Sequence, residues 1–207
     1  MDRFDSCFRP GLFDGKTVLV TGGGTGIGRC TAHELASLGA TVVIVGRRAE
    51  PLATTAEEIH TAGGRCETTQ LNIRDEEAVE RTIESLVERH GRIDGLVNNA
   101  GGQFVQPAAQ MSPKGWRAVV DLILNGTFLM SSAVFRHSME KHGGAIVNML
   151  ADIWTGHPGM AHMAAARGGL ANLTLTLSME WAGHDVRVNS VAPGTILSSG
   201  MLTYPRA

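Results

Sequence analysis

Short runs of β-branched residues alternate with longer helical patterns along this chain of 207 residues. Parallel strands need helix-length crossover connections of this kind, and they are buried on both faces. The alternation therefore predicts an α/β fold, a Rossmann-type doubly wound parallel sheet of six strands with helices on both faces. No linker, repeat or low-complexity tract interrupts it, so we expect a single domain over residues 1–207. The expected strands are residues 17–20, 41–45, 66–71, 93–97, 145–149 and 186–191.

Helix-start and helix-stop signals mark the segments between these strands. An acidic turn at residues 75–77 precedes apolar residues at helical spacing, and Gly91 follows them. Ser112 and Pro113 are typical of an N-cap and a first helical position, and they predict a long helical region that runs to His142. Further helices are expected up to Leu38, over residues 51–62 and over residues 162–182.

Composition and charge argue against nucleic acids, metal ions and membranes as partners of this chain. The formal net charge is −2 and the basic residues are scattered, apart from Arg47 and Arg48, which argues against a nucleic-acid-binding surface. Cys7, Cys30 and Cys66 lie far apart without metal-ligand spacing, so we expect no metal site and a reducing compartment. No secretory signal is recognisable, and no apolar run approaches the roughly 18 residues that cross a bilayer. We expect a cytoplasmic protein without a membrane span.

A glycine-rich segment, residues 21–28 with the sequence TGGGTGIG, joins the first expected strand to the next helix. Glycines permit a tight turn and a close approach of the backbone to a diphosphate, while a helix N-terminus offers unpaired N–H groups to that anion. At the first strand–helix junction of an alternating chain, the pattern predicts dinucleotide binding rather than turn chemistry alone. The residues expected to hold the diphosphate are Gly22, Thr25, Gly26, Ile27 and Gly28.

Two arginines, Arg47 and Arg48, follow Gly46 at the end of the second expected strand. An acidic residue here would hydrogen-bond the adenosine ribose hydroxyls of NAD, whereas guanidinium groups suit the 2′-phosphate of NADP. The sequence therefore predicts NADP(H) as the coenzyme. The alternative is that both arginines only begin the next helix in solvent.

Four motifs that occur in register along the chain carry a family resemblance. They are residues 21–28, the Asn-Asn-Ala-Gly segment at 98–101, Asn125, and the Pro-Gly pair at 193–194. Together they resemble the short-chain dehydrogenase/reductase family over essentially the whole chain. The resemblance implies a nicotinamide coenzyme, and it implies homo-oligomers that associate through the helices carrying Asn125 and Arg167.

The same resemblance assigns roles to further side chains. Asn72, at the end of the third expected strand, matches a position that often carries an adenine-contacting Asp. Asn125 is expected to order a water molecule or a donor near the substrate. The residues expected along the riboses and the nicotinamide are Asn99, Gly101, Arg167, Pro193, Gly194 and Ile196.

Longer matches indicate one branch of the family. Residues 99–104, 113–116 and 162–169 resemble peroxisomal trans-2-enoyl-CoA reductases, and residues 121–127 resemble 2,4-dienoyl-CoA reductases. The branch implies NADPH-dependent reduction of a carbon–carbon double bond in a fatty acyl-CoA substrate. It also makes the peroxisome an alternative to the cytoplasm.

The chain departs from the family at the positions of its catalytic Ser, Tyr and Lys. Alignment on the helix that begins near His162 puts Leu150, Met163 and Arg167 there. Arg167 stays protonated and can still reach the coenzyme ribose, but the thioether of Met163 cannot supply a proton. Ketone reduction creates an alkoxide that needs a proton donor beside it. Reduction of an enoyl thioester spreads charge into an enolate, which neutral donors stabilise, so the substitutions favour enoyl reduction.

Other interpretations of this site stay open. His162, beside the vacant tyrosine position, and Asp152, at a strand end, are candidate proton donors, with capping or surface roles as the alternative for both. A catalytically silent nucleotide-binding domain is the competing function, and a carbonyl or alcohol dehydrogenase ranks third.

The length of the chain is a second departure from the family. It ends at Ala207, before the substrate-covering helical segment and the seventh strand that family members usually have. We therefore expect residues 186–191 to form an edge strand that is unprotected unless a partner covers it, and we interpret the chain as a candidate truncated gene product.

Overall fold

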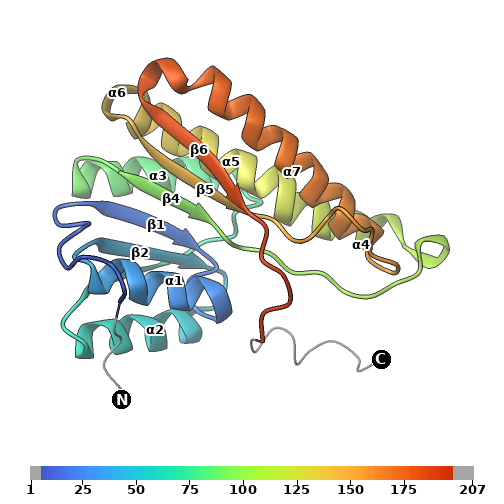
Figure 1. The fold of residues 1–207 in the computed structure, drawn as a ribbon, viewed down its shortest axis with the longest axis horizontal. Coiled ribbons are helices and arrows are strands. Elements are labelled where there is room, and N and C mark those ends of the chain that lie inside the picture. The colour runs from blue at the N-terminus through green and yellow to red at the C-terminus, as the bar shows by residue number, and fades with distance from the viewer. Residues whose placement is uncertain (1–5, 198–207) are drawn as a thin grey trace.

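A parallel sheet of six strands forms the centre of the computed structural model, which describes residues 6–197 (Figure 1). The strand order is β3-β2-β1-β4-β5-β6, so the chain winds outward from β1 in one direction and then from β4 in the other. Every neighbouring pair is parallel. The predicted fold class is confirmed. The strands are β1 (Thr17–Thr21), β2 (Thr41–Gly46), β3 (Arg65–Gln70), β4 (Gly95–Asn98), β5 (Gly144–Met149) and β6 (Val186–Val191).

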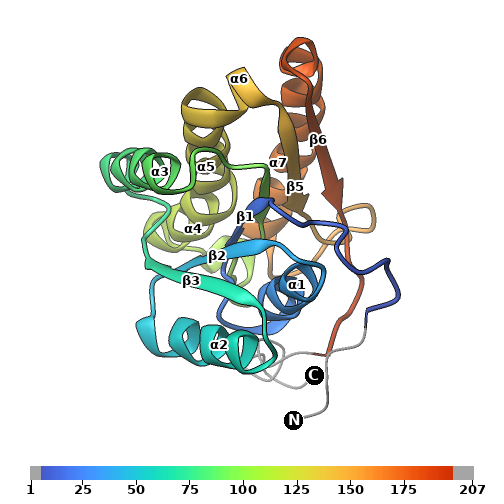
Figure 2. The same cartoon turned by 90° about the vertical axis from the view of Figure 1, so that its left-hand side faces the viewer.

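Helices cover both faces of the sheet (Figure 2). On one face lie α1 (Gly26–Ser37) and α2 (Ala49–Thr61); on the other lie α3 (Glu76–His90), α4 (Pro113–Val120), α5 (Gly126–Val134), α6 (Glu140–His142) and α7 (Ala161–Glu180). The helices α4, α5 and α6 are one continuous stretch, because two wide π-type turns, Asp121–Asn125 and Phe135–Met139, connect them. The predicted long helical region is therefore present, with two interruptions of its 3.6-residue period.

The helix ends follow the expected local chemistry. The Ser112 hydroxyl accepts the N–H of Gly115 at 3.0 Å, and the Asp75 carboxylate accepts the N–H of Ala78 at 3.0 Å. Gly91 ends α3 with φ of +77°, a value that favours glycine. One strand begins later than predicted: β4 starts at Gly95, because the N–H of Ile93 is bound by the Ser138 hydroxyl at 2.8 Å instead of by a neighbouring strand.

Two apolar cores lie on opposite faces of the sheet. The core under α1 and α2 contains Val20, Ile44 and Ile59, and the core under α3, α5 and α7 contains Leu19 and Ile146. A third, smaller cluster joins α4 to α7 near the carboxyl ends of the strands. The alternation of Leu19 and Val20 between the two cores is the expected result of the two-residue repeat of a strand.

One helical stretch in the described part of the chain, Pro113–His142, is long and apolar enough to cross a membrane by length and composition. This corrects the expectation that no apolar run is long enough. The stretch is apolar because it supplies core residues: Ile123, Met130, Val134 and Met139 are fully buried. In this fold it packs against the sheet, α3 and α7.

Within residues 6–197, β6 is the last strand of the sheet and pairs with β5 alone. Val186 and Val188 are buried against the α7 side, whereas Arg187 and Asn189 are exposed on the other face. The predicted edge position of this strand is confirmed. The end of the chain, residues 198–207, lies outside the described residues.

Candidate functional site

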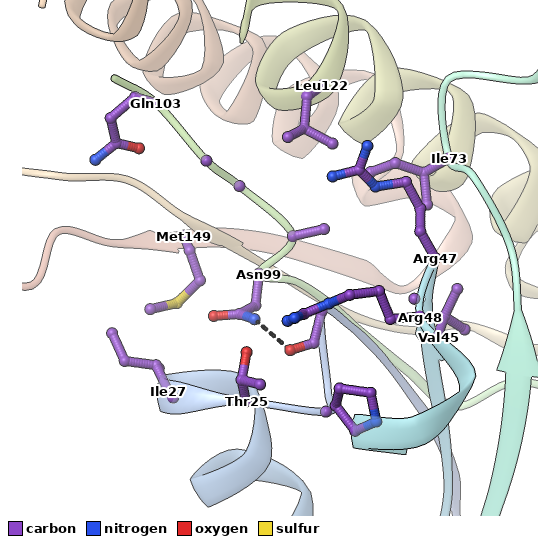
Figure 3. Close-up of a pocket in the computed structure, with 18 of the residues that line it drawn as sticks. Thr25, Ile27, Val45, Arg47, Arg48, Ile73, Asn99, Gln103, Leu122 and Met149 are labelled. Atoms are coloured by element: carbon purple, nitrogen blue, oxygen red, sulfur yellow. Dashed lines mark hydrogen bonds between the residues drawn. The ribbon is translucent and has the colours of Figure 1, made fainter. Parts of the chain in front are cut away.

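A cavity of ≈ 640 Å³ opens at the carboxyl ends of the strands, where the strand order reverses between β1 and β4. The loops after these two strands leave the sheet in opposite directions, and a crevice at this point is where doubly wound sheets bind ligands. Residues from the loops after all six strands line it. Figure 3 shows the side chains at its wall.

The glycine-rich turn after β1 forms the floor of the cavity. Gly22 and Gly26 have φ of +67° and +54°, so the turn depends on glycine at both positions. A Cβ at Gly28 would lie 2.3 Å from the carbonyl oxygen of Gly22 and 2.4 Å from Nδ2 of Asn99. The backbone around Gly28 is therefore packed so closely that no side chain fits there. The first turn of α1 faces the cavity. A diphosphate fits such a cradle.

Thr21 and Asn99 tie this turn to the loop after β4. The Thr21 hydroxyl accepts the N–H groups of Asn99 at 3.0 Å and Ala100 at 2.9 Å. Nδ2 of Asn99 donates to the carbonyl oxygens of Thr21 at 2.9 Å and Gly22 at 3.3 Å, the latter bond being dashed in Figure 3. The side-chain nitrogen of Asn99 thus holds the two walls of the cavity together.

Arg47 and Arg48 lie at the end of β2 and line one end of the cavity (Figure 3). The backbone there is fixed, since Gln70 donates from Nε2 to the Arg47 carbonyl at 2.8 Å. Asn72 also lines this end, and its Oδ1 accepts from Nε of Arg74 at 3.2 Å. The end of the cavity near β2 is therefore cationic, as an adenosine phosphate requires.

The opposite end of the cavity is apolar apart from a few polar groups. Arg167 is buried on α7 and donates from Nη1 to the carbonyl oxygen of Met149. A Cβ at Gly101 would lie 2.7 Å from Nη2 of Arg167, so any larger residue at that position would shift the guanidinium. Leu150 and Met163 are both buried in the apolar cluster between α4 and α7, and Leu150 lines the cavity.

The structure does not bring the two candidate proton donors, His162 and Asp152, or Asn125 to the cavity wall. His162 is fully buried, its Nδ1 accepts the N–H of Met163 at 2.8 Å, and its ring packs edge-on against Phe104 at 4.6 Å. Asn125 closes a π-type turn, is exposed, and donates to Asp121 at 2.8 Å. The Asp152 carboxylate accepts the N–H of Trp154 at 3.2 Å within its own loop. These three side chains are bound within their own surroundings and do not line the cavity, and their roles beside a substrate stay predictions.

Most of the expected coenzyme-binding residues do line the cavity. Those present at its wall are Gly22, Thr25, Gly26, Ile27, Arg47, Arg48, Asn72, Asn99, Gly101, Arg167, Pro193, Gly194 and Ile196. Gly28 lies behind the turn rather than at the wall. Gln103, Leu122, Met149 and Met160 are among the lining residues that sequence reasoning missed. Gln103 follows β4 and Met149 ends β5, so their place at the carboxyl ends of strands was the available signal.

No group of three or more His, Cys, Asp or Glu side chains among residues 6–197 is arranged to hold a metal ion. Two ionisable side chains with a shifted pKa, Cys66 and Glu58, lie away from the cavity. Burial raises the pKa of the Cys66 thiol to about 12, and the hydrogen bond from Arg29 lowers the pKa of Glu58.

Comparison with known proteins agrees with this geometry. A family model described as short chain dehydrogenase matches residues 16–206. The probable 2,4-dienoyl-CoA reductase of Bacillus subtilis is 41% identical over 188 residues, which cover 89% of this chain and 74% of that protein. The chain spans 62% to 75% of the length of the curated relatives it matches, three of them at less than two thirds.

Solved structures share the fold. The citronellol catabolism dehydrogenase AtuB of Pseudomonas aeruginosa PAO1 superposes with a TM-score of 0.90 at 55% identity, covering 92% of this chain and 79% of that one. An actinorhodin polyketide ketoreductase with NADPH gives a TM-score of 0.86 at 31% identity, covering 89% of this chain and 71% of that one. The family model matches most of the chain, and the glycine-rich turn and the cavity where the strand order reverses agree with it. This chain therefore belongs to the short-chain dehydrogenase family of oxidoreductases.

Proposed function

We propose that this protein uses NADPH to reduce the carbon–carbon double bond of an enoyl-CoA. The observation that carries the proposal is the pair Leu150 and Met163, which are buried and apolar where carbonyl reducers of the family place hydroxyl groups. Residues 6–197 contain no tyrosine, since the single tyrosine of the chain is Tyr204. An alkoxide product has no phenol to protonate it there, whereas an enolate has no such need. The dienoyl-CoA reductase of B. subtilis supports the same substrate class.

In the proposed reaction, the residues around the cavity have different roles. NADPH, when bound, supplies the hydride that reaches the β-carbon of the enoyl thioester. In this proposal Arg167, which donates to the Met149 carbonyl, binds the ribose next to the nicotinamide, and Gly101 leaves room for its guanidinium. Leu150 and Met163 keep water from that end, which strengthens hydrogen bonds to the developing enolate. The α-carbon then takes its proton from water.

A spectrophotometric assay with NADPH tests the reaction. Crotonyl-CoA, longer 2-enoyl-CoAs and a 2,4-dienoyl-CoA are expected to be turned over, with acetoacetyl-CoA as the ketone control. Turnover of the ketone alone would reverse the assignment. Tight NADPH binding without turnover of any of these substrates would establish the competing interpretation, a catalytically silent nucleotide-binding domain.

The preference for NADPH rests on Arg47 and Arg48. Replacing both with alanine removes two charged donors from the 2′-phosphate, so we expect the Kd for NADPH to rise about 10- to 100-fold. The Kd for NADH, which lacks that phosphate, is expected to change less than about threefold. Arg81→Ala is the matched control, because Arg81 is exposed on α3 and pairs with Glu77. Equal losses for the two coenzymes would contradict the proposal.

One relative favours a second candidate. The 55% identity with AtuB supports oxidation of a terpenoid alcohol such as citronellol with NADP⁺. Citronellol in the same assay distinguishes the two, since the enoyl-CoA proposal predicts no oxidation of it. For either substrate we propose a homo-oligomer in the cytoplasm, with the peroxisome as the alternative compartment.

A further inference from the structure

We infer that Gln103 is the substrate-binding hydrogen-bond donor of this site and polarises the thioester carbonyl of the enoyl-CoA. This inference rests on the proposed function. Gln103 belongs to the loop after β4, is half-buried and lines the cavity. Figure 3 shows it on the opposite side of the view from Arg47, with Met149 below it.

Several other polar groups of the wall are already engaged or lie elsewhere, which leaves the Thr195 hydroxyl as the competing donor that the test below distinguishes. Nδ2 of Asn99 donates to two backbone carbonyls, and Nη1 of Arg167 donates to the Met149 carbonyl. Asn72 lies at the cationic end and binds Arg74. The amide of Gln103 makes no hydrogen bond to any residue between 6 and 197, so it is available to a ligand.

Contacts with neighbouring elements fix the position of the loop that carries Gln103. The N–H of Gln106 donates to the carbonyl of Gly159 at 2.8 Å, which joins this loop to the one after β5. On the next residue, the Phe104 ring packs against His162 and would touch a Cβ at Gly115 at 2.9 Å. Gln103 therefore lies between these contacts and the hydrogen bonds from Asn99 and Ala100 to Thr21, so its segment is anchored on both sides.

A neutral amide donor suits this reaction. Hydride addition at the β-carbon breaks the carbon–carbon π bond and moves an electron pair through the α-carbon onto the thioester oxygen. Nε2–H of Gln103 hydrogen-bonds that oxygen more strongly as its charge grows, without giving up its proton. Water then protonates the α-carbon and the thioester carbonyl re-forms. Gln103 thus takes over the oxygen-binding task of the hydroxyls that Leu150 and Met163 replace.

Three variants test the role of Gln103. Gln103→Ala is expected to lower kcat for crotonyl-CoA about 100-fold, the usual effect of losing one such donor, with little change in the Kd for NADPH. Gln103→Glu keeps the shape but replaces the donor with a repelling charge, so its kcat is expected to be lower still. Gln103→Asn is expected to retain part of the activity.

A binding measurement without turnover gives a second readout. With NADP⁺ in place of NADPH, 2,4-hexadienoyl-CoA is expected to show a red-shifted absorbance when bound to the wild-type protein, because a hydrogen-bonded carbonyl draws electron density from the diene. The shift is expected to disappear in Gln103→Ala and Gln103→Glu.

The matched controls are Gln106→Ala and Thr195→Val. Gln106 lies in the same loop but donates to Gln110, and Thr195 is the remaining hydroxyl near this end of the wall. Both variants are expected to keep the red shift. Loss of the shift in Thr195→Val but not in Gln103→Ala would overturn the inference. Absence of enoyl-CoA turnover by the wild-type protein would instead overturn the proposed function, so the two failures are distinguishable.

Discussion

At the scale of single residues, Gly28 shows how tightly the coenzyme cradle is built. Alanine there would place a methyl carbon 2.3 Å from the Gly22 carbonyl, and backbone cannot yield as a flexible side chain can. We expect Gly28→Ala to raise the Kd for NADPH at least about tenfold and to lower the free energy of unfolding by about 1–3 kcal/mol. Coenzyme titration and urea unfolding measure the two effects.

A second glycine supplies the control for this substitution. Gly168 lies in α7, and a Cβ built on it meets no other atom within 4 Å. Gly168→Ala is therefore expected to leave the Kd for NADPH unchanged and to raise stability by up to about 1 kcal/mol through helix propensity. If both variants behaved alike, the crowding around Gly28 would not be the cause.

At the scale of secondary-structure elements, one carboxylate joins α1 to α2. Glu58 accepts two hydrogen bonds from Arg29, at 2.7 and 2.8 Å, and contacts His33 at 3.1 Å. These donors, Arg29 first, hold the pKa of Glu58 below its usual value. A carboxyl with a lowered folded-state pKa contributes stability that is present above about pH 4.3 and is lost as the pH falls through the folded-state value.

The substitution Glu58→Gln tests this pH dependence. We expect it to cost about 1 kcal/mol at pH 7, because Arg29 is partly exposed and solvent weakens the pair. It is also expected to flatten the fall in stability below about pH 4.3, where the wild-type carboxyl takes up its proton. Chemical unfolding between pH 7 and pH 3 provides the measurement, and parallel curves for the two proteins would contradict the expectation.

A buried chain of hydrogen bonds links β4, β5 and α7 below the cavity. Asn98 donates to Asn148 at 2.9 Å, Asn148 donates to Thr174 at 3.0 Å, and Thr174 donates to the Leu170 carbonyl at 2.8 Å. Thr174→Val keeps the shape but leaves the Asn148 amide unpaired, so we expect a loss of about 1–3 kcal/mol in urea unfolding. Thr174→Ser, which retains the hydroxyl, is expected to lose less than half as much.

The elements themselves were largely predictable, because strands and helix ends depend on local sequence. Ser112, Asp75 and Gly91 act at their own positions, and the structure places them as expected. The direction in which a helical side chain points was harder to predict. Each π-type turn adds a residue to one helical turn and so rotates the rest of the helix by about 100°, and Asn125 closes such a turn. The burial of His162 depends on a ring from a distant loop, which no local pattern encodes.

At the scale of the whole molecule, exposed apolar side chains on α5 and α7 mark the surface where we expect copies of the chain to associate. Phe128, Leu175 and Met179 are 47%, 64% and 80% exposed. We expect a homo-oligomer in solution, and the double substitution Leu175→Glu with Met179→Glu is expected to reduce its mass toward that of a monomer, since two buried charges per copy oppose contact. Light scattering after size-exclusion chromatography measures it. Trp154→Glu, on the loop after β5, is the control that should leave the mass unchanged.

The reversal of strand order beside β1 divides the cavity into one end expected to bind the coenzyme phosphates and another end expected to bind the substrate. The end that holds the phosphates rests on the core under α1 and α2, and the reacting end rests on the cores beneath α5 and α7. These cores share no residues, since the sheet stands between them. We therefore expect that grafting the loops after β4 and β5 from a relative with another substrate changes the substrate but leaves the preference between NADPH and NADH the same. Evolution can exchange one half of such an enzyme without rebuilding the other.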